Sequence, residues 1–224
     1  MIKVSSVHKL LFLLILLYAP WASAIETKFS YSDFYKRLAV VKKEGLTRVT
    51  PAFYLLDQNA QQPCQLAKAV LETANRQVAI TQTPSGELLV PYDVKLKQEK
   101  AELVLVFAHE QTDCAMSLQT KLLVPISGIQ DVDGLSKIAD ELEKLMLGQA
   151  GFWGKLFLPD FNGISLTLAG DFATDQQAVF SIANTDFAVE QGHVYLSKQW
   201  LAEHQGKAVQ LADSVIDIKP WLVQ

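Results

Sequence analysis

Short β-strand patterns recur every ten to twelve residues between Thr47 and Pro125, with no amphipathic helix between them. The runs are rich in β-branched and aromatic residues, and polar turn clusters such as Pro84-Ser85-Gly86 separate them. Strands that follow one another in this way pair antiparallel in a sandwich or meander. We therefore expect a β-sandwich-like module here. The predicted strands are Val49–Leu56, Gln65–Leu71, Gln77–Gln82, Leu88–Val90, Glu102–His109 and Ala115–Val124.

An amphipathic helix is predicted before this module, over Tyr31–Glu44. Apolar Phe34, Leu38 and Val41 recur at helical spacing, which places them on one face. Ser30 and Asp33 have the spacing of a capping box, and Gly45 is placed to end the helix.

A second helix is predicted after Asp131 or Asp133, either of which can cap its start, and Gly148 is expected to end it. Strand patterns resume from Ile164. The expected fold class is α+β and mostly antiparallel β, with the N-terminal amphipathic helix, this central helix and a smaller C-terminal β lobe. We expect a signal peptide at 1–24, a helix plus sandwich-like module at 25–130, and a helix plus C-terminal β lobe at 131–224.

The N-terminus has the pattern of a secretory signal. Lys3 and Lys9 precede the apolar run Leu10–Ala19, and Ala22-Ser23-Ala24 is a small-x-small cleavage site. A run of about ten residues is too short for a transmembrane helix, which needs roughly 20. We expect cleavage after Ala24, a periplasmic protein and no stable membrane insertion after cleavage; the alternative is an uncleaved N-terminal anchor.

The two cysteines, Cys64 and Cys114, both follow the predicted signal. In an oxidising compartment an isolated pair of cysteines favours a disulfide. A metal site would need further Cys or His ligands at short spacing, and a redox pair would be spaced C-x-x-C. We therefore predict a structural Cys64–Cys114 bridge.

Charge argues against a nucleic-acid partner. Removing the signal with its two lysines lowers the formal net charge from −4 to −6, and an acidic chain does not suit phosphate backbones. The sequence contains no nucleophile elbow, zinc-protease or P-loop motif. The segment His109–Cys114 holds a base, two carboxylates and a thiol, yet a polar turn explains it better. No catalytic residue, metal site or cofactor is predicted, and the sequence favours a role that is not enzymatic.

An aromatic segment after the second helix is the best candidate for binding. Rings alternate there with glycines and one lysine, a composition that suits a groove for an apolar or glycan ligand or an envelope protein. The competing interpretation is that these rings simply cover the core. The candidate binding residues are Phe152, Trp153, Lys155, Phe157 and Phe161.

Two other functions stay open. One is a hydrolase of envelope polymers that draws paired carboxylates from Asp160, Asp171, Asp175 or Asp186. The other is a carrier that encloses an apolar molecule near the aromatic segment. The preferred hypothesis is an exported periplasmic protein that binds an envelope protein or ligand without catalysis; the oligomeric state is left open.

The chain as a whole resembles an uncharacterised family of exported Gram-negative bacterial proteins, known as a domain of unknown function. The resemblance rests on Tyr31-Ser32-Asp33-Phe34-Tyr35, Phe53-Tyr54-Leu55, Pro63-Cys64, Gly86-Glu87-Leu88-Leu89-Val90-Pro91-Tyr92-Asp93, Gly151-Phe152-Trp153-Gly154-Lys155-Leu156 and Pro220-Trp221-Leu222. It implies export and a common α+β plan. It carries over no activity and no site residue.

Overall fold

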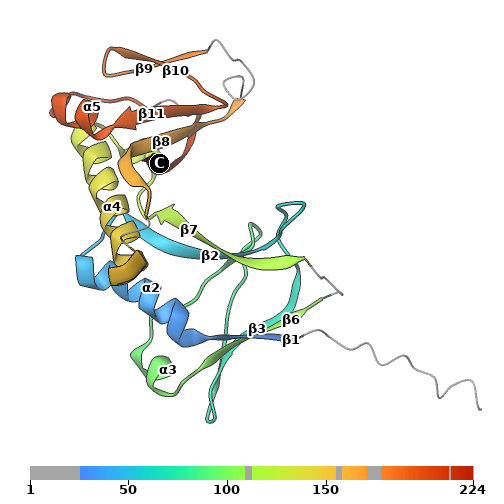
Figure 1. Ribbon diagram of the computed structural model, residues 1–224. Helices are drawn as coiled ribbons and strands as arrows, with labels where there is room; N and C mark the ends of the chain where they lie inside the picture. Colours follow the sequence, from blue (N-terminus) through green and yellow to red (C-terminus); the bar gives the residue numbers. More distant parts are fainter. Residues whose placement is uncertain (1–25, 109–112, 155–157, 171–177, 212, 224) are drawn as a thin grey trace, which may run out of the picture.

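The computed structural model describes residues 26–108, 113–154, 158–170, 178–211 and 213–223, with residues 151–154 described as backbone only. Figure 1 shows two groups of strands at either end of a long central helix, α4. The elements of the N-terminal part are β1 (Glu26–Ser30), α2 (Tyr31–Glu44), β2 (Val49–Asp57), β3 (Leu66–Glu72), β4 (Gln77–Ala79), β5 (Glu87–Leu88), α3 (Val94–Gln98), β6 (Glu102–Phe107) and β7 (Cys114–Leu122).

The remaining elements follow β7 along the chain. They are the 3-10 helix η2 (Ile126–Gly128), α4 (Val132–Gly154), β8 (Asp160–Leu168), β9 (Val179–Ile182), β10 (Thr185–Ala188), β11 (His193–Ser197), α5 (Lys198–Glu203) and β12 (Val215–Val223). All the strand pairings are antiparallel, so the predicted α+β class with mostly antiparallel β structure is confirmed.

The N-terminal strands form two sheets, with strand orders β1-β6-β3-β4 and β5-β2-β7. Side chains from both sheets and from α2 meet in one core, which includes Phe34, Phe53, Leu71 and Leu103. The sheet edges nearest α2 are β1 and β7, each hydrogen-bonded to a neighbouring strand on one side only. This arrangement leaves α2 beside the opening between those two edges.

Tyr31 fixes the start of α2. Its side chain is fully buried, and its hydroxyl donates to the carbonyl of Pro91 at 2.7 Å while accepting from the amide of Asp93 at 2.8 Å. A buried phenol normally requires such partners, because an unpaired polar group in the core is costly. The contact ties the β1–α2 junction to the segment that leads into α3.

The C-terminal strands form the sheet β11-β8-β12, with the hairpin β9–β10 beside it. Alternate residues of the sheet, among them Ile164, Leu166, Val194 and Ile218, are buried in a second core with the apolar stripe of α4. Gly163 permits a close approach of β8 to β11, since a Cβ at this position would overlap the carbonyl of Leu196. The second core also takes in Val40 of α2, so α4 bridges both parts of the molecule.

One helix cap and one helix end differ from the sequence prediction, whereas the predicted bounds of α2, Tyr31–Glu44, are confirmed. Ser30 is the N-cap of α2, but its side chain makes no capping hydrogen bond, and Asp33 contacts Lys36 instead; the predicted capping box was wrong. The strand β1 runs directly into this residue, so its orientation follows the sheet. Helix α4 continues past Gly148 to Gly154. Gly148 faces Val40 where α2 and α4 pack, so it serves the close approach of the two helices and not the end of α4.

Other predicted features are confirmed. Gly45 ends α2 in the left-handed conformation with φ of 65°. The carboxylate of Asp131 accepts from the amide of Gly134 at 2.7 Å, which makes it the cap of α4. Cys64 and Cys114 form a disulfide between residues 50 apart in sequence. The bridge joins the segment before β3 to the first residue of β7.

Candidate functional site

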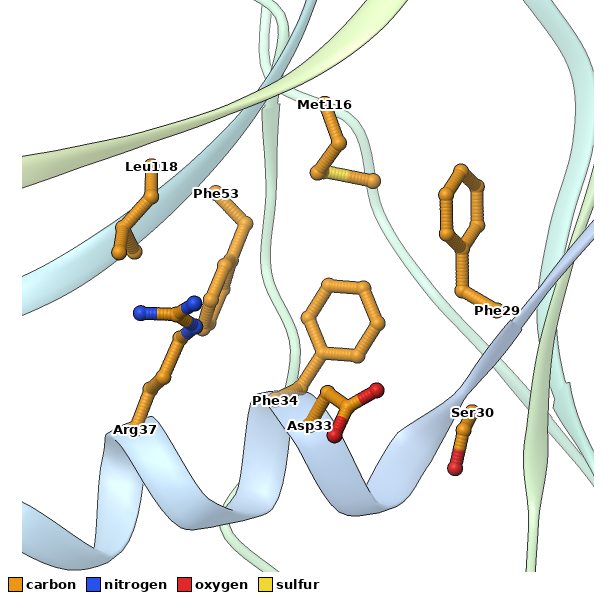
Figure 2. Close-up of a pocket in the computed structure, with 8 residues that line it drawn as sticks. All are labelled: Phe29, Ser30, Asp33, Phe34, Arg37, Phe53, Met116 and Leu118. Atoms are coloured by element: carbon orange, nitrogen blue, oxygen red, sulfur yellow. The ribbon is translucent and has the colours of Figure 1, made fainter. Parts of the chain in front are cut away.

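A pocket of 210 Å³ opens between β1, α2, β2 and β7. Figure 2 shows the apolar side chains from these four elements gathered around it. Five apolar side chains form most of its wall, and Ser30, Asp33 and Arg37 supply polar groups. The lining residues are Phe29, Ser30, Asp33, Phe34, Arg37, Phe53, Met116 and Leu118.

Strand and helix periodicity explain why the apolar side chains converge. Phe53 and Leu118 are directly opposite each other in the β2–β7 ladder, so their side chains share a face of the sheet. Met116 lies two residues before Leu118 and therefore points to the same face. The ring of Phe34 packs edge-on against Phe53, with centroids 4.8 Å apart, and against Phe29 at 6.4 Å.

The pocket is not closed by its own side chains. Leu118 is 38 % exposed, although its side chain lines an apolar wall. Phe29 and Met116 are half-buried, whereas Phe34 and Phe53 are buried at the base. A group that entered the pocket would therefore cover apolar surface that now meets water, which favours binding.

Arg37 gives the rim a positive charge. Within the described ranges its guanidinium makes no hydrogen bond and no ion pair. The neighbouring carboxylate of Asp33 lies 3.4 Å from the ammonium of Lys36, at the exposed surface. Figure 2 shows the Arg37 side chain rising from α2 beside Phe53, toward Leu118. An anion held next to the apolar wall would meet unused donors there.

A second hollow of 310 Å³ continues the first along α2. It shares Asp33 and Arg37 with the first pocket and adds Lys36, Gly148 and Gln149. The contact between Gly148 and Val40 sets how closely α2 and α4 approach. Arg37 therefore stands between an apolar pocket on one side and a polar hollow on the other.

The predicted aromatic segment is only partly described. Phe152 and Trp153 lie in the last turn of α4, and nothing is described of their side chains; Lys155 and Phe157 fall outside the described residues. Phe161 is half-buried on β8 and packs against the C-terminal core, with the ammonium of Lys198 5.7 Å from its ring centre. The part of the segment that is described therefore does not form the pocket.

The polar face of the C-terminal sheet brings together groups that could suggest catalysis. His193 Nδ1 lies 3.3 Å from the hydroxyl of Ser165 and 3.4 Å from that of Thr167. Asp217, on the far side of β8, pairs with Lys219 at 3.0 Å. A nucleophile–base–carboxylate relay needs the carboxylate on one ring nitrogen and the hydroxyl on the other. Here both hydroxyls approach the same nitrogen, so the described geometry is not that relay.

No described contact joins the acids proposed for a hydrolase. Asp160 lies on β8, whereas Asp186 lies on β10 and accepts a hydrogen bond from Ser181. Asp171 and Asp175 fall outside the described residues. Where the structure is described, no three His, Cys, Asp or Glu side chains are grouped as a metal site requires. None of the described helices is long and apolar enough to cross a membrane.

Sequence reasoning missed the pocket for a specific reason. The apolar face of α2 and the alternation of Met116 and Leu118 are both readable in the sequence. What could not be read is that β1 and β7 are sheet edges, because strand order depends on pairings between distant segments. Only the position of β7 makes Arg37 part of a site.

The architecture is that of a small α+β protein built on antiparallel sheets. The chain belongs to a family described as a protein of unknown function (DUF2987), whose family model matches residues 23–168. The match covers the whole N-terminal part, α4 and β8. Comparison with curated proteins and with solved structures found no match.

Proposed function

We propose that this protein is an exported, non-catalytic binding protein of the bacterial periplasm, and that its pocket accepts an apolar group joined to an anion. The observation that carries the proposal is the guanidinium of Arg37, which has no partner among the described residues and lies beside a wall of five apolar side chains. Export is supported by the signal pattern at 1–24 and by the Cys64–Cys114 disulfide, a bond typical of oxidising compartments.

The apolar wall and the charged rim of the pocket contribute to binding in different ways. Burial of apolar ligand surface supplies most of the binding free energy, at roughly 25 cal/mol per Å². The guanidinium orients the ligand, because an anion at that rim gains a charge-assisted hydrogen bond. The aromatic segment starts within one helical turn of Gln149, which lines the second hollow, and we propose that it extends the same surface.

The dye 1-anilinonaphthalene-8-sulfonate tests this proposal, because it joins an apolar ring system to an anion. Its fluorescence titration should give saturable binding to the folded protein. The variant Arg37→Gln should weaken that binding about fivefold, equivalent to about 1 kcal/mol. Added salt should weaken binding to the wild type and have less effect on the variant. Leu118→Asp should remove binding, since it places a charge in the apolar mouth.

Two controls make the result specific. Lys43→Gln removes the same charge from the same helix, but Lys43 lines neither hollow; binding should stay within twofold of the wild type, roughly the spread of surface substitutions. Urea unfolding must confirm that each variant is folded, because the dye also binds partly unfolded chains. Equal binding by the wild type, Arg37→Gln and Leu118→Asp would reject the pocket as the site.

A further inference from the structure

The side of β7 that faces away from β2 carries backbone amides and carbonyls with no partner in the described sheets, and it lies beside the pocket. Ladder hydrogen bonds in an antiparallel pair alternate, so every second residue of an edge strand points its amide and carbonyl away from its partner. The amide of Gln58 bonds the carbonyl of Asp113, and the amide of Leu123 bonds the carbonyl of Arg48, at the two ends of the β2–β7 ladder. The odd-numbered residues of β7 between Asp113 and Leu123 therefore direct their backbone amides and carbonyls toward β2.

The even-numbered residues of β7 consequently face outward. Met116, Leu118 and Thr120 direct their amides and carbonyls to the open edge. Pro51, which lies opposite Thr120, has no amide, and this agrees with a pair that makes no ladder bonds. Within the described ranges neither Met116 nor Leu118 has a backbone partner on that side. Such an edge is a template for one further strand.

The residues with open backbone groups are also those whose side chains line the pocket. Met116 and Leu118 project into it from the inner face of the sheet. In an antiparallel pair, directly opposite residues project to the same face. A strand added to this edge would therefore direct the residues opposite Met116 and Leu118 into the pocket, while its intervening residues pointed to the outer face.

The ends of the open edge limit what can bind. The carbonyl of Thr120 is already occupied by the ammonium of Lys219, at 2.8 Å, so the free template ends at Leu118. Arg37 lies near this end, with no partner of its own among the described residues. A short strand that carries a carboxylate next to its apolar residues would match both the backbone pattern and the charge.

We propose that the occupant of the pocket is an extended segment of another polypeptide, added antiparallel to β7, with apolar residues opposite Met116 and Leu118 and a carboxylate at Arg37. This inference rests on the proposed function and names the ligand class of the same site. A lipid-like ligand would use the pocket and Arg37 but not the open backbone groups. A second copy of this chain paired through β7 would instead produce a dimer.

Short random peptides displayed on phage provide the probe. They are selected on the wild-type protein and counter-selected on Leu118→Asp, and the best sequence is synthesised. Enriched peptides should alternate apolar and polar residues and carry an acidic residue. Methylation of single backbone nitrogens should weaken binding roughly tenfold at every second position, the effect of about 1.4 kcal/mol from lost hydrogen bonds, and little at the positions between.

A pair of protein variants isolates the backbone of β7. Leu118→Pro removes the outward amide without removing a ladder bond, since prolines are accepted at edge positions whose amide faces outward. Leu118→Ala shortens the side chain and keeps the amide. Both variants lose the Leu118 side chain from the pocket wall, so both should weaken dye binding to a similar extent. The peptide should bind Leu118→Pro at least roughly tenfold more weakly than Leu118→Ala, because only the proline variant also lacks the amide.

The outcomes separate the two proposals. Weaker dye binding by Arg37→Gln together with no peptide enrichment, or with peptides insensitive to backbone methylation, would overturn strand addition and leave the pocket as a small-ligand site. Dye binding unaffected by the pocket variants would reject the proposed function itself. A concentration-dependent dimer in sedimentation, abolished by Leu118→Pro, would replace the foreign peptide by a second copy.

Discussion

The carboxylate of Glu141, on α4, accepts hydrogen bonds from the consecutive backbone amides of Thr47 and Arg48 at 2.9 and 2.7 Å. The hydroxyl of Thr47 and the guanidinium of Arg48 add contacts at 3.1 and 3.2 Å. Both amides lie just before β2, so one buried carboxylate joins the central helix to the first strand of the sheet that lines the pocket.

Glu141→Ala should lower the free energy of unfolding by about 2–4 kcal/mol, because it leaves two backbone amides without their acceptor. Urea unfolding at pH 7 measures this. Glu143→Ala is the control on the same helix, since that carboxylate makes one exposed ion pair with Lys198 and should matter little. Similar losses for both variants would contradict the assigned role of Glu141.

The same site predicts a pH dependence. Burial acts to raise the pKa of Glu141, but the amides of Arg48 and Thr47 outweigh it and hold the pKa below the ordinary value of 4.5. A carboxyl whose pKa is lower in the folded state stabilises the protein above its unfolded pKa and loses that contribution as the pH falls through the folded pKa. The difference in stability between wild type and Glu141→Gln should therefore shrink below about pH 4.5. A constant difference from pH 7 to pH 3 would contradict this assignment.

Tyr31→Phe should lower the free energy of unfolding by about 1–2 kcal/mol, since the amide of Asp93 and the carbonyl of Pro91 lose their buried partner. Tyr35→Phe is the matched control, because among the described residues that hydroxyl contacts only the half-buried hydroxyl of Tyr92. It should change stability by less than about 0.5 kcal/mol. Chemical denaturation of the two variants side by side makes the comparison.

Gly148→Ala should destabilise the protein by about 1–2 kcal/mol, because the added methyl group would overlap the side chain of Val40. Helix propensity alone predicts the opposite sign, a gain of about 1 kcal/mol. The double variant Gly148→Ala, Val40→Ala should recover part of the overlap cost, and a double-mutant cycle measures it. Strict additivity would mean that the α2–α4 contact is looser than described.

Replacing both Cys64 and Cys114 by serine should lower the free energy of unfolding by about 4 kcal/mol in the chain-entropy model, given the separation of 50 residues. Because Cys114 begins β7, peptide binding should weaken as well. Reductant should affect the wild type and leave the double variant unchanged. Equal stability of the two proteins would show that the bridge contributes nothing to folding.

Local patterns predicted much of the secondary structure, and tertiary contacts decided the rest. The apolar spacing of α2, the cap at Asp131 and the left-handed Gly45 all depend on neighbouring residues, so they could be read in advance. The prediction that Gly148 ends α4 was wrong, because this glycine leaves space for the side chain of Val40 on α2. The capping box at Ser30 failed because β1 directs the chain into α2.

The site was less predictable than the fold. Aromatic composition favoured Phe152–Phe161, whereas the pocket is assembled from one to three residues of each of four elements, separated by up to about ninety positions. No local pattern marks such a set. The disulfide was more predictable than the pocket. The chain has two cysteines, and in an oxidising compartment this number alone predicts the pairing of Cys64 with Cys114.

The family match ends at residue 168, which is also the last residue of β8. That strand is the middle of its sheet, held by β11 on one side and β12 on the other, and both of these lie beyond the match. A fragment that stopped there would expose two bare edges and the apolar side chains of Ile164, Leu166 and Leu168. We therefore expect the segment that matches the family model to be smaller than the unit that folds, and its expression alone should yield aggregates.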